Sequence, residues 1–124
     1  MIKDSIEKQT DDVILATALK RASSLMGISN SSLAKILKID TNTLSRIFEN
    51  GINPDSQRGH ASTLIVRIYK SLSQLSGNDN NYIQHFLFSE NRYFRNKPIN
   101  VMETIDGLIL INKYLDTMTS QSWK

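Results

Sequence analysis

Side chains that can recognise the edges of DNA bases are grouped in one short stretch of this sequence. Four polar residues occupy the face of a predicted helix opposite its apolar side: Thr41, Asn42, Ser45 and Arg46. Asparagine and arginine are the side chains best shaped for bidentate hydrogen bonds with adenine and guanine. Ser31, in the preceding helix, and Lys38, in the turn before this one, complete the predicted DNA-binding set. Helix pairs of this size also occur in proteins that never touch nucleic acid, so the pattern leaves DNA binding and a purely structural role open.

Residues 29–51 must form the element that positions these side chains. Apolar residues recur there at one-turn spacing on both sides of a break at Lys38-Ile39-Asp40, which predicts two short helices joined by a tight turn. Ser29 and Asp40 are the predicted N-caps, because their side-chain oxygens can accept from backbone N–H groups that the first helical turn leaves unpaired. Gly51 is predicted to end the second helix. A small residue, Ala34, allows the two helices to cross closely, as in a helix-turn-helix.

The charge of the chain permits contact with phosphate groups without requiring it. The net charge is only +3 over 124 residues. Between residues 20 and 58, six cations face three acids, and this local excess suits a polyanion. The composition is 40% apolar, which is ordinary for a globular protein. No apolar run is long enough to span a bilayer and residues 1–10 carry no secretory segment, so a cytoplasmic protein is expected.

The residues that could do catalytic or metal chemistry are too few and too scattered. There is no cysteine, and the two histidines, His60 and His85, do not form a ligand-spaced cluster with acids. No phosphate-binding glycine motif or nucleophile motif is present. Glu103 and Asp106 are three residues apart at a predicted helix end, where capping or dipole compensation is the simpler role. We therefore expect neither an enzyme nor a cofactor.

The rest of the chain predicts an all-α fold. An N-terminal helix is predicted from a Thr10 cap to Gly27, after nine loosely structured residues, and it should brace the helix pair. Residues 52–62 form the clearest composition break, and the next helix starts either at Pro54 or at Ala61 and closes at Gly77. The predicted division is therefore a DNA-binding domain at 1–52, a linker at 53–60 and a second helical domain at 61–124, which should pack on the N-terminal helices.

Three further helices are predicted after residue 77. Either Asn78 or Asp79 caps a short helix, and residues 89–97 follow as an irregular connector. Pro98 suits the first position of a second short helix through Ile105. Asp106-Gly107 is expected to form a break between this short helix and a final helix.

Motifs in both halves resemble known families. Motifs of the N-terminal half resemble those of Xre-like helix-turn-helix proteins: Gly27-Ile28-Ser29, Leu33-Ala34, Ile39 and Leu44-Ser45-Arg46. Residues 98–107, PINVMETIDG, resemble the Pro, Thr and Gly spacing of the Xre/MbcA/ParS toxin-binding domain. Four other residues fall where that family would place them: Arg67, Asn91, Phe94 and Leu115. The two resemblances together cover residues 12–118.

The sequence departs from these families at two positions where glycine is common. Lys38 stands in the turn of the helix pair, where a non-glycine residue in the left-handed region costs about 1 kcal/mol. Asn96 stands in the connector, and asparagine tolerates left-handed backbone comparatively well. Neither departure removes the fold.

The resemblance implies an antitoxin of a type II toxin–antitoxin pair. The usual partner of such antitoxins is a RES-domain toxin that degrades NAD or transfers ADP-ribose. The C-terminal domain would cover the active site of the toxin, and the helix-turn-helix, as a homodimer, would repress the operon through its own promoter. The predicted toxin-binding residues are Tyr93, Arg95, Lys97, Thr104, Asp106 and Trp123.

The composition of the connector agrees with such a role, because aromatic and cationic side chains suit the walls and acids of a nucleotide cleft. Each of these residues could equally be an ordinary core or surface residue, and Trp123 could fold back on the core. Two rival functions stay open. One is a stand-alone regulator whose C-terminal half only dimerises, and the other is an antitoxin whose helix-turn-helix is a scaffold that no longer binds DNA.

Overall fold

The computed structural model describes residues 2–122, which form an all-α fold, as predicted. These residues contain seven helices and no strand, apart from a single bridge between Asn91 and Asn96. The helices are α1 (Ile2–Leu25), α2 (Asn30–Leu37), α3 (Thr41–Asn50), α4 (Gln57–Ser76), α5 (Asn80–Phe88), α6 (Pro98–Val101) and α7 (Ile105–Ser122).

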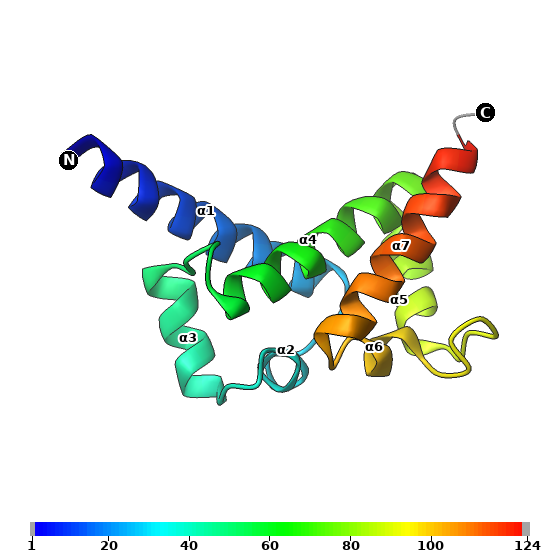
Figure 1. Ribbon diagram of the computed structural model, residues 1–124. Helices are drawn as coiled ribbons and strands as arrows, with labels where there is room; N and C mark the ends of the chain where they lie inside the picture. The colour runs from blue at the N-terminus through cyan, green and yellow to red at the C-terminus, as the bar shows by residue number, and fades with distance from the viewer. Residues whose placement is uncertain (1, 123–124) are drawn as a thin grey trace.

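Helix α4 lies at the centre of the arrangement (Figure 1). Helices α1 and α3 lie on one side of it, and α5, α6 and α7 lie on the other. Its residues Leu64, Ile65, Ile68 and Leu72 are all buried, as their spacing predicts. They belong to one apolar cluster that runs from Ala16 of α1 to Leu115 of α7. The expected packing of the second half on the N-terminal helices is therefore confirmed.

The N-terminal helix begins earlier than the sequence predicted. Helix α1 starts at Ile2, so the expectation of a loose segment is wrong for residues 2–9, and so is the N-cap at Thr10; Met1 lies outside the described residues. The physical reason is that the segment contains neither proline nor glycine, and four of its residues are good helix formers: Lys3, Glu7, Lys8 and Gln9. The predicted end is correct, because the helix stops at Leu25 and Gly27 follows with a φ of 74°.

Helix α4 begins between the two starts that the sequence left open. Ser56 is its N-cap, with a side-chain oxygen that accepts from the Gly59 N–H at 3.0 Å. Pro54 and Ala61 are therefore both wrong as first residues, because the cap at Ser56 satisfies the helix start. The helix starts inside the predicted linker 53–60, and the domain boundary itself stays a prediction.

A buried polar contact joins α4 to α7. Asn112 of α7 is 4% exposed, and its side-chain amide donates to the Leu64 carbonyl of α4 at 3.2 Å and to the Leu108 carbonyl at 2.9 Å. A buried amide that finds a partner only in one arrangement favours that arrangement of the two helices. Within residues 2–122, the helices lack the combination of length and apolar character needed to cross a membrane.

The turn between α2 and α3 has the predicted geometry. Ser29 caps α2 by accepting from the Ser32 N–H at 3.1 Å, and Asp40 caps α3 by accepting from the Thr43 N–H at 2.7 Å. Gly51 ends α3. Lys38 ends α2 in the left-handed region, with φ 61° and ψ 44°, as expected for a position where related turns carry glycine.

Replacing Lys38 with glycine should therefore stabilise the protein. Lys38→Gly is expected to raise the free energy of unfolding by about 0.5 to 1 kcal/mol, because glycine adopts this backbone without a Cβ clash. Urea denaturation measures the change. The matched control is Lys35→Gly, one turn earlier inside α2, which should lower the free energy of unfolding by about 1 kcal/mol. A destabilised Lys38→Gly variant would contradict the assigned backbone strain.

Candidate functional site

Helix α3 presents the predicted polar face to solvent. Leu44 is buried, and Ile47 and Phe48 are half-buried against the core. The four residues of the opposite face are all exposed: Thr41, Asn42, Ser45 and Arg46. Ser31, the fifth predicted residue, is also exposed in the first turn of α2. The structure therefore brings these five residues to the surface, and their binding to DNA stays a prediction.

The charged side chain of Asp40 stabilises the first turn of α3. Hydrogen bonds from the Thr43 side chain and backbone N–H hold the pKa of the Asp40 carboxyl below its ordinary value. The positive charge of Arg46 acts on the pKa in the same direction. The carboxylate is therefore charged near neutral pH and holds the first turn of α3, from which Thr41 and Asn42 project.

A cation of α1 also lies beside α3. Lys20 Nζ lies 5.7 Å from the centre of the Phe48 ring, within the range of a cation–π interaction. Sequence reasoning counted Lys20 among the cations of this region but did not pair it with Phe48, because no local spacing connects two helices that meet only in the folded chain.

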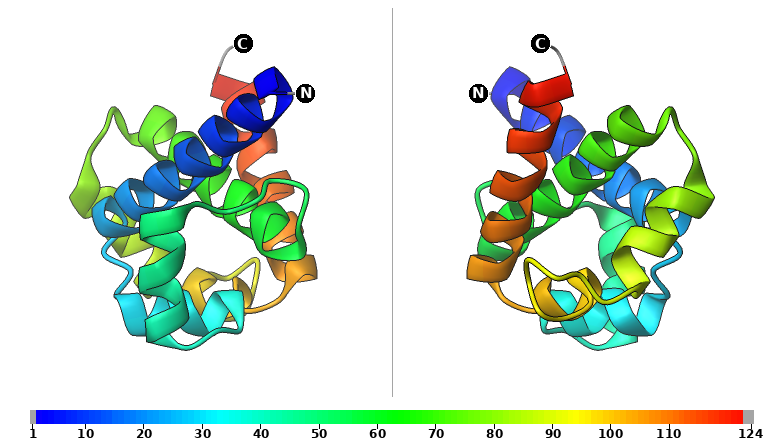
Figure 2. Two further views of the ribbon diagram at one scale, coloured as in Figure 1. Left: turned by 90° about the vertical axis from the view of Figure 1, so that its left-hand side faces the viewer. Right: turned by 90° about the vertical axis from the view of Figure 1, so that its right-hand side faces the viewer.

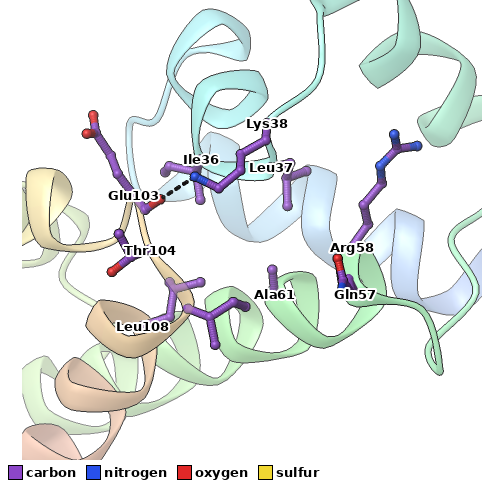
Figure 3. Close-up of a pocket in the computed structure, with 10 residues that line it drawn as sticks. Ile36, Leu37, Lys38, Gln57, Arg58, Ala61, Glu103, Thr104 and Leu108 are labelled. Carbon is purple, nitrogen blue, oxygen red and sulfur yellow. Dashed lines mark hydrogen bonds between the residues drawn. The ribbon is translucent and has the colours of Figure 1, made fainter.

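Lys38, the sixth predicted DNA-binding residue, is turned towards the second half of the chain. Its Nζ donates to the Glu103 carbonyl at 3.4 Å, and Lys35 Nζ lies 3.2 Å from a Glu103 carboxylate oxygen (Figure 3). Asp106 lies in the first turn of α7, as its predicted role at a helix end requires, and Glu103 lies just before that helix and also pairs with Lys35. Glu103 thereby links the α6–α7 junction to α2.

The connector, residues 89–97, is held in a compact turn. The Asn91 N–H donates to the Asn96 carbonyl at 2.9 Å, and the Arg95 N–H donates to the Asn91 carbonyl at 2.8 Å. The left-handed residue of this turn is Arg95, with a φ of 55°, and not Asn96, where the sequence placed the usual glycine. The Asn96 side chain instead accepts from the Lys97 N–H at 2.8 Å and from the Asn100 amide at 3.0 Å.

An aromatic cluster attaches the connector to α7. Tyr114 of α7 lies 4.9 Å from Tyr93 and 5.1 Å from Phe94, measured between ring centres, and 6.4 Å from Phe86. Phe94 is half-buried, whereas Tyr93 is 63% exposed. Tyr114 was missed from the sequence, although its position three residues after Ile111 places it at the edge of the apolar stripe of α7.

The junction between α6 and α7 explains the spacing of Pro98, Thr104 and Gly107. Pro98 is the first residue of α6, as predicted. Thr104 caps α7, since its Oγ1 accepts from the Gly107 N–H at 3.0 Å. A Cβ on Gly107 would lie 1.7 Å from the Val101 carbonyl oxygen, so the close approach of α7 to the end of α6 requires glycine.

Two predictions about this segment are wrong. Ile105 begins α7 and does not belong to the short helix, which ends at Val101. Asp106 and Gly107 lie in the first turn of α7 and do not form a break before it. The Thr104 cap sets the earlier start. Upstream, the alternative between Asn78 and Asp79 is resolved: Asp79 caps α5, and Asn78 has a φ of 65°.

The predicted toxin-binding residues fall into two groups. Tyr93, Arg95 and Lys97 are exposed on the connector, whereas Thr104 and Asp106 are exposed at the start of α7. Trp123 lies outside the described residues.

Helix α2, the first turn of α3 and α6 lie along one edge of the molecule in all three views (Figures 1 and 2). Among the side chains that the structure describes, no three His, Cys, Asp or Glu residues come together as a metal site would require.

Comparison with known proteins identifies the second half of the chain. Residues 71–120 match the model of the antitoxin Xre/MbcA/ParS C-terminal toxin-binding domain. This range contains the connector, the aromatic cluster and the α6–α7 junction. The match confirms the family that the sequence resemblance suggested for this part of the chain. No relative was found among curated proteins.

The close contact at Gly107 makes a strong prediction for stability. Gly107→Ala should lower the free energy of unfolding by at least about 2 kcal/mol, because the added Cβ overlaps the Val101 carbonyl. Thermal and urea denaturation measure the loss. The neighbouring Asp106→Ala is the control and should cost only about 0.5 kcal/mol, the usual value of an exposed acid in the first turn of a helix. Equal stability of Gly107→Ala and the wild type would disprove the close approach.

Proposed function

We propose that this protein is the antitoxin of a RES-domain toxin and neutralises it by covering its active site. The proposal is supported by the match of residues 71–120 to an antitoxin toxin-binding domain. The family match is the observation that carries the proposal. RES-domain partners are what the sequence resemblance implies. In this proposal the toxin degrades NAD or transfers ADP-ribose, and the antitoxin needs no catalytic group of its own.

The connector is the part best suited to enter the active site of the toxin. Tyr93 presents an exposed ring, and Arg95 and Lys97 present cations beside it. A cleft that binds a dinucleotide offers flat apolar walls and polar groups for phosphate and ribose, and aromatic and cationic side chains complement both. The Asn91–Asn96 turn and the contact with Tyr114 hold the connector in place before binding, which lowers the entropic cost of association.

The exposed polar face of α3 supports a second activity, binding of the promoter of its own operon. Arg46 and Asn42 are the groups proposed to contact base edges in the major groove, with Ser31, Thr41, Ser45 and Lys38 contributing contacts to phosphates or bases. A homodimer would place two such helices on adjacent half-sites. In this proposal the antitoxin acts in the cytoplasm.

A second candidate function, a DNA-binding regulator whose C-terminal half only dimerises, is favoured by apolar side chains exposed on that half. Phe88 and Leu110 are each 41% exposed, and Ile105 is 39% exposed. A dimer contact would cover such residues. The two functions differ in whether a toxin is bound at all, so toxin capture separates them.

Toxin capture is tested with the RES-domain protein encoded beside this chain. Co-expression should rescue growth, and the two proteins should co-purify. Tyr93→Ala should weaken the complex by about tenfold or more, because exposed tyrosines that become buried are frequent anchors of interfaces. Isothermal titration calorimetry measures the change in Kd.

Tyr82→Ala is the matched control for this experiment. Tyr82 is a tyrosine on α5 that is 44% exposed, outside the connector. Its replacement should leave the Kd within about twofold, the range typical of a residue outside an interface hot spot. Absence of both rescue and co-purification with the wild-type chain would refute the antitoxin proposal and favour the stand-alone regulator.

Promoter binding makes a separate prediction. A dimer that places about four to six cations on phosphates should lose two to three orders of magnitude of affinity between about 50 and 200 mM salt. Arg46→Ala should reduce discrimination between promoter and unrelated DNA by about tenfold or more, the usual value of one bidentate base contact, and leave toxin capture intact. Fluorescence anisotropy measures both effects.

Arg67→Ala, an exposed arginine of α4, is the control and should keep promoter discrimination. If Arg46→Ala loses promoter binding and toxin capture together, Arg46 is structural. If the wild-type chain shows no binding to its promoter even at low salt, the α2–α3 pair serves only as a scaffold.

A further inference from the structure

A groove lies where the two halves of the chain meet. We name it the inter-module groove. Its volume is about 250 Å³. Apolar side chains from three helices line it: Ile36 and Leu37 of α2, Ala61 of α4 and Leu108 of α7 (Figure 3). Thr104, which caps α7, lies on its rim. The groove therefore adjoins the matched toxin-binding domain and the helix pair that carries the DNA-facing residues.

Two cations and one acid are among the residues that line this groove. Lys38 reaches from the end of α2 towards the α6–α7 junction, where its Nζ donates to the Glu103 carbonyl at 3.4 Å (Figure 3). Arg58 of α4 also lines the groove, and its side chain extends away from Lys38, towards α3. Glu103 also lines the rim, but its carboxylate already pairs with Lys35 at 3.2 Å. An entering anion would thus meet the charge of Lys38 at the α6–α7 side of the groove, and the charge of Arg58 would add to the attraction from the α3 side.

The size of the groove limits what can occupy it. Sites for whole small-molecule ligands usually have volumes of about 300 to 1,000 Å³, which is more than this groove offers. One or two side chains of a protein fit the available space. The apolar lining residues favour a hydrophobic side chain, and the cations Lys38 and Arg58 favour a carboxylate next to it.

We infer that the inter-module groove binds a short segment of the toxin that carries an apolar side chain and an adjacent carboxylate. This inference rests on the proposed antitoxin function. The Lys38 ammonium would exchange the neutral Glu103 carbonyl for the carboxylate of the toxin. Hydrogen bonds between two charged groups are shorter and stronger than those with a neutral acceptor, so the exchange favours the complex.

A toxin bound at this groove would contact both halves of the antitoxin. Lys38 belongs to the turn that leads directly into α3, which starts at Thr41. A partner that binds the Lys38 side chain therefore contacts the turn that positions α3, the helix proposed to bind DNA. Toxin and promoter affinities should be coupled through this turn, each changing the other by the same factor.

The test compares toxin binding by two groove variants and a control whose change of net charge matches that of Arg58→Glu, with the purified RES-domain protein as the probe and calorimetry as the readout. Lys38→Gly removes one rim cation and should raise the Kd for the toxin about tenfold, the usual effect of losing a charged hydrogen bond. Because Lys38→Gly is expected to be at least as stable as the wild type, weaker binding cannot come from misfolding. Arg58→Glu reverses the other rim charge and should weaken binding about tenfold or more.

The control is Arg21→Glu on α1, an exposed arginine outside this groove with the same change of net charge. It should leave the Kd within about twofold, as expected for a charge outside the interface. If Tyr93→Ala weakens the complex while Lys38→Gly and Arg58→Glu bind like the wild type, the groove inference is wrong and the antitoxin proposal stands. If the wild-type chain does not bind the toxin, both fail. Equal weakening by Arg21→Glu would also overturn the inference, because it would reduce the effect to general charge.

Discussion

The simultaneous burial of α4 against α1 and α7 is the constraint on which the rest of this molecule depends. Ile65 and Ile68 are fully buried in the shared core, and full burial of such a side chain contributes about 1.5 to 3 kcal/mol. One rigid helix thereby carries the helix pair on one side and the toxin-binding helices on the other (Figure 1). The positions of α3 and of the connector relative to each other follow from this packing.

Polar contacts between the halves are weaker than this packing and therefore adaptable. The Lys35–Glu103 pair is largely exposed, and exposed pairs usually contribute about 0 to 1 kcal/mol. Such contacts cannot hold the two halves together, but they can be exchanged for contacts with a partner at little cost. This makes the inter-module groove a surface that a bound protein could reorganise while the apolar core stays intact.

The toxin-binding half combines a rigid base with an exposed edge. Pro98, Thr104 and Gly107 each serve a local need, respectively the start of α6, the cap of α7 and the close approach of the two helices. Tyr114 then supports the connector from α7 and leaves Tyr93 exposed. The family spacing is thus a requirement of backbone geometry, whereas the exposed side chains of the connector are not fixed by it.

The sequence by itself determined the features that depend on residues within about one helical turn. The Ser29 and Asp40 caps, the left-handed Lys38 and the exposed face of α3 were all predicted correctly, because caps and apolar periodicity act over three or four positions. Only the tertiary structure decided which distant residues meet. Lys38 and Glu103 are 65 positions apart, and the left-handed residue of the connector proved to be Arg95 and not Asn96. Such contacts arise from the packing of whole helices around α4, which no local pattern encodes.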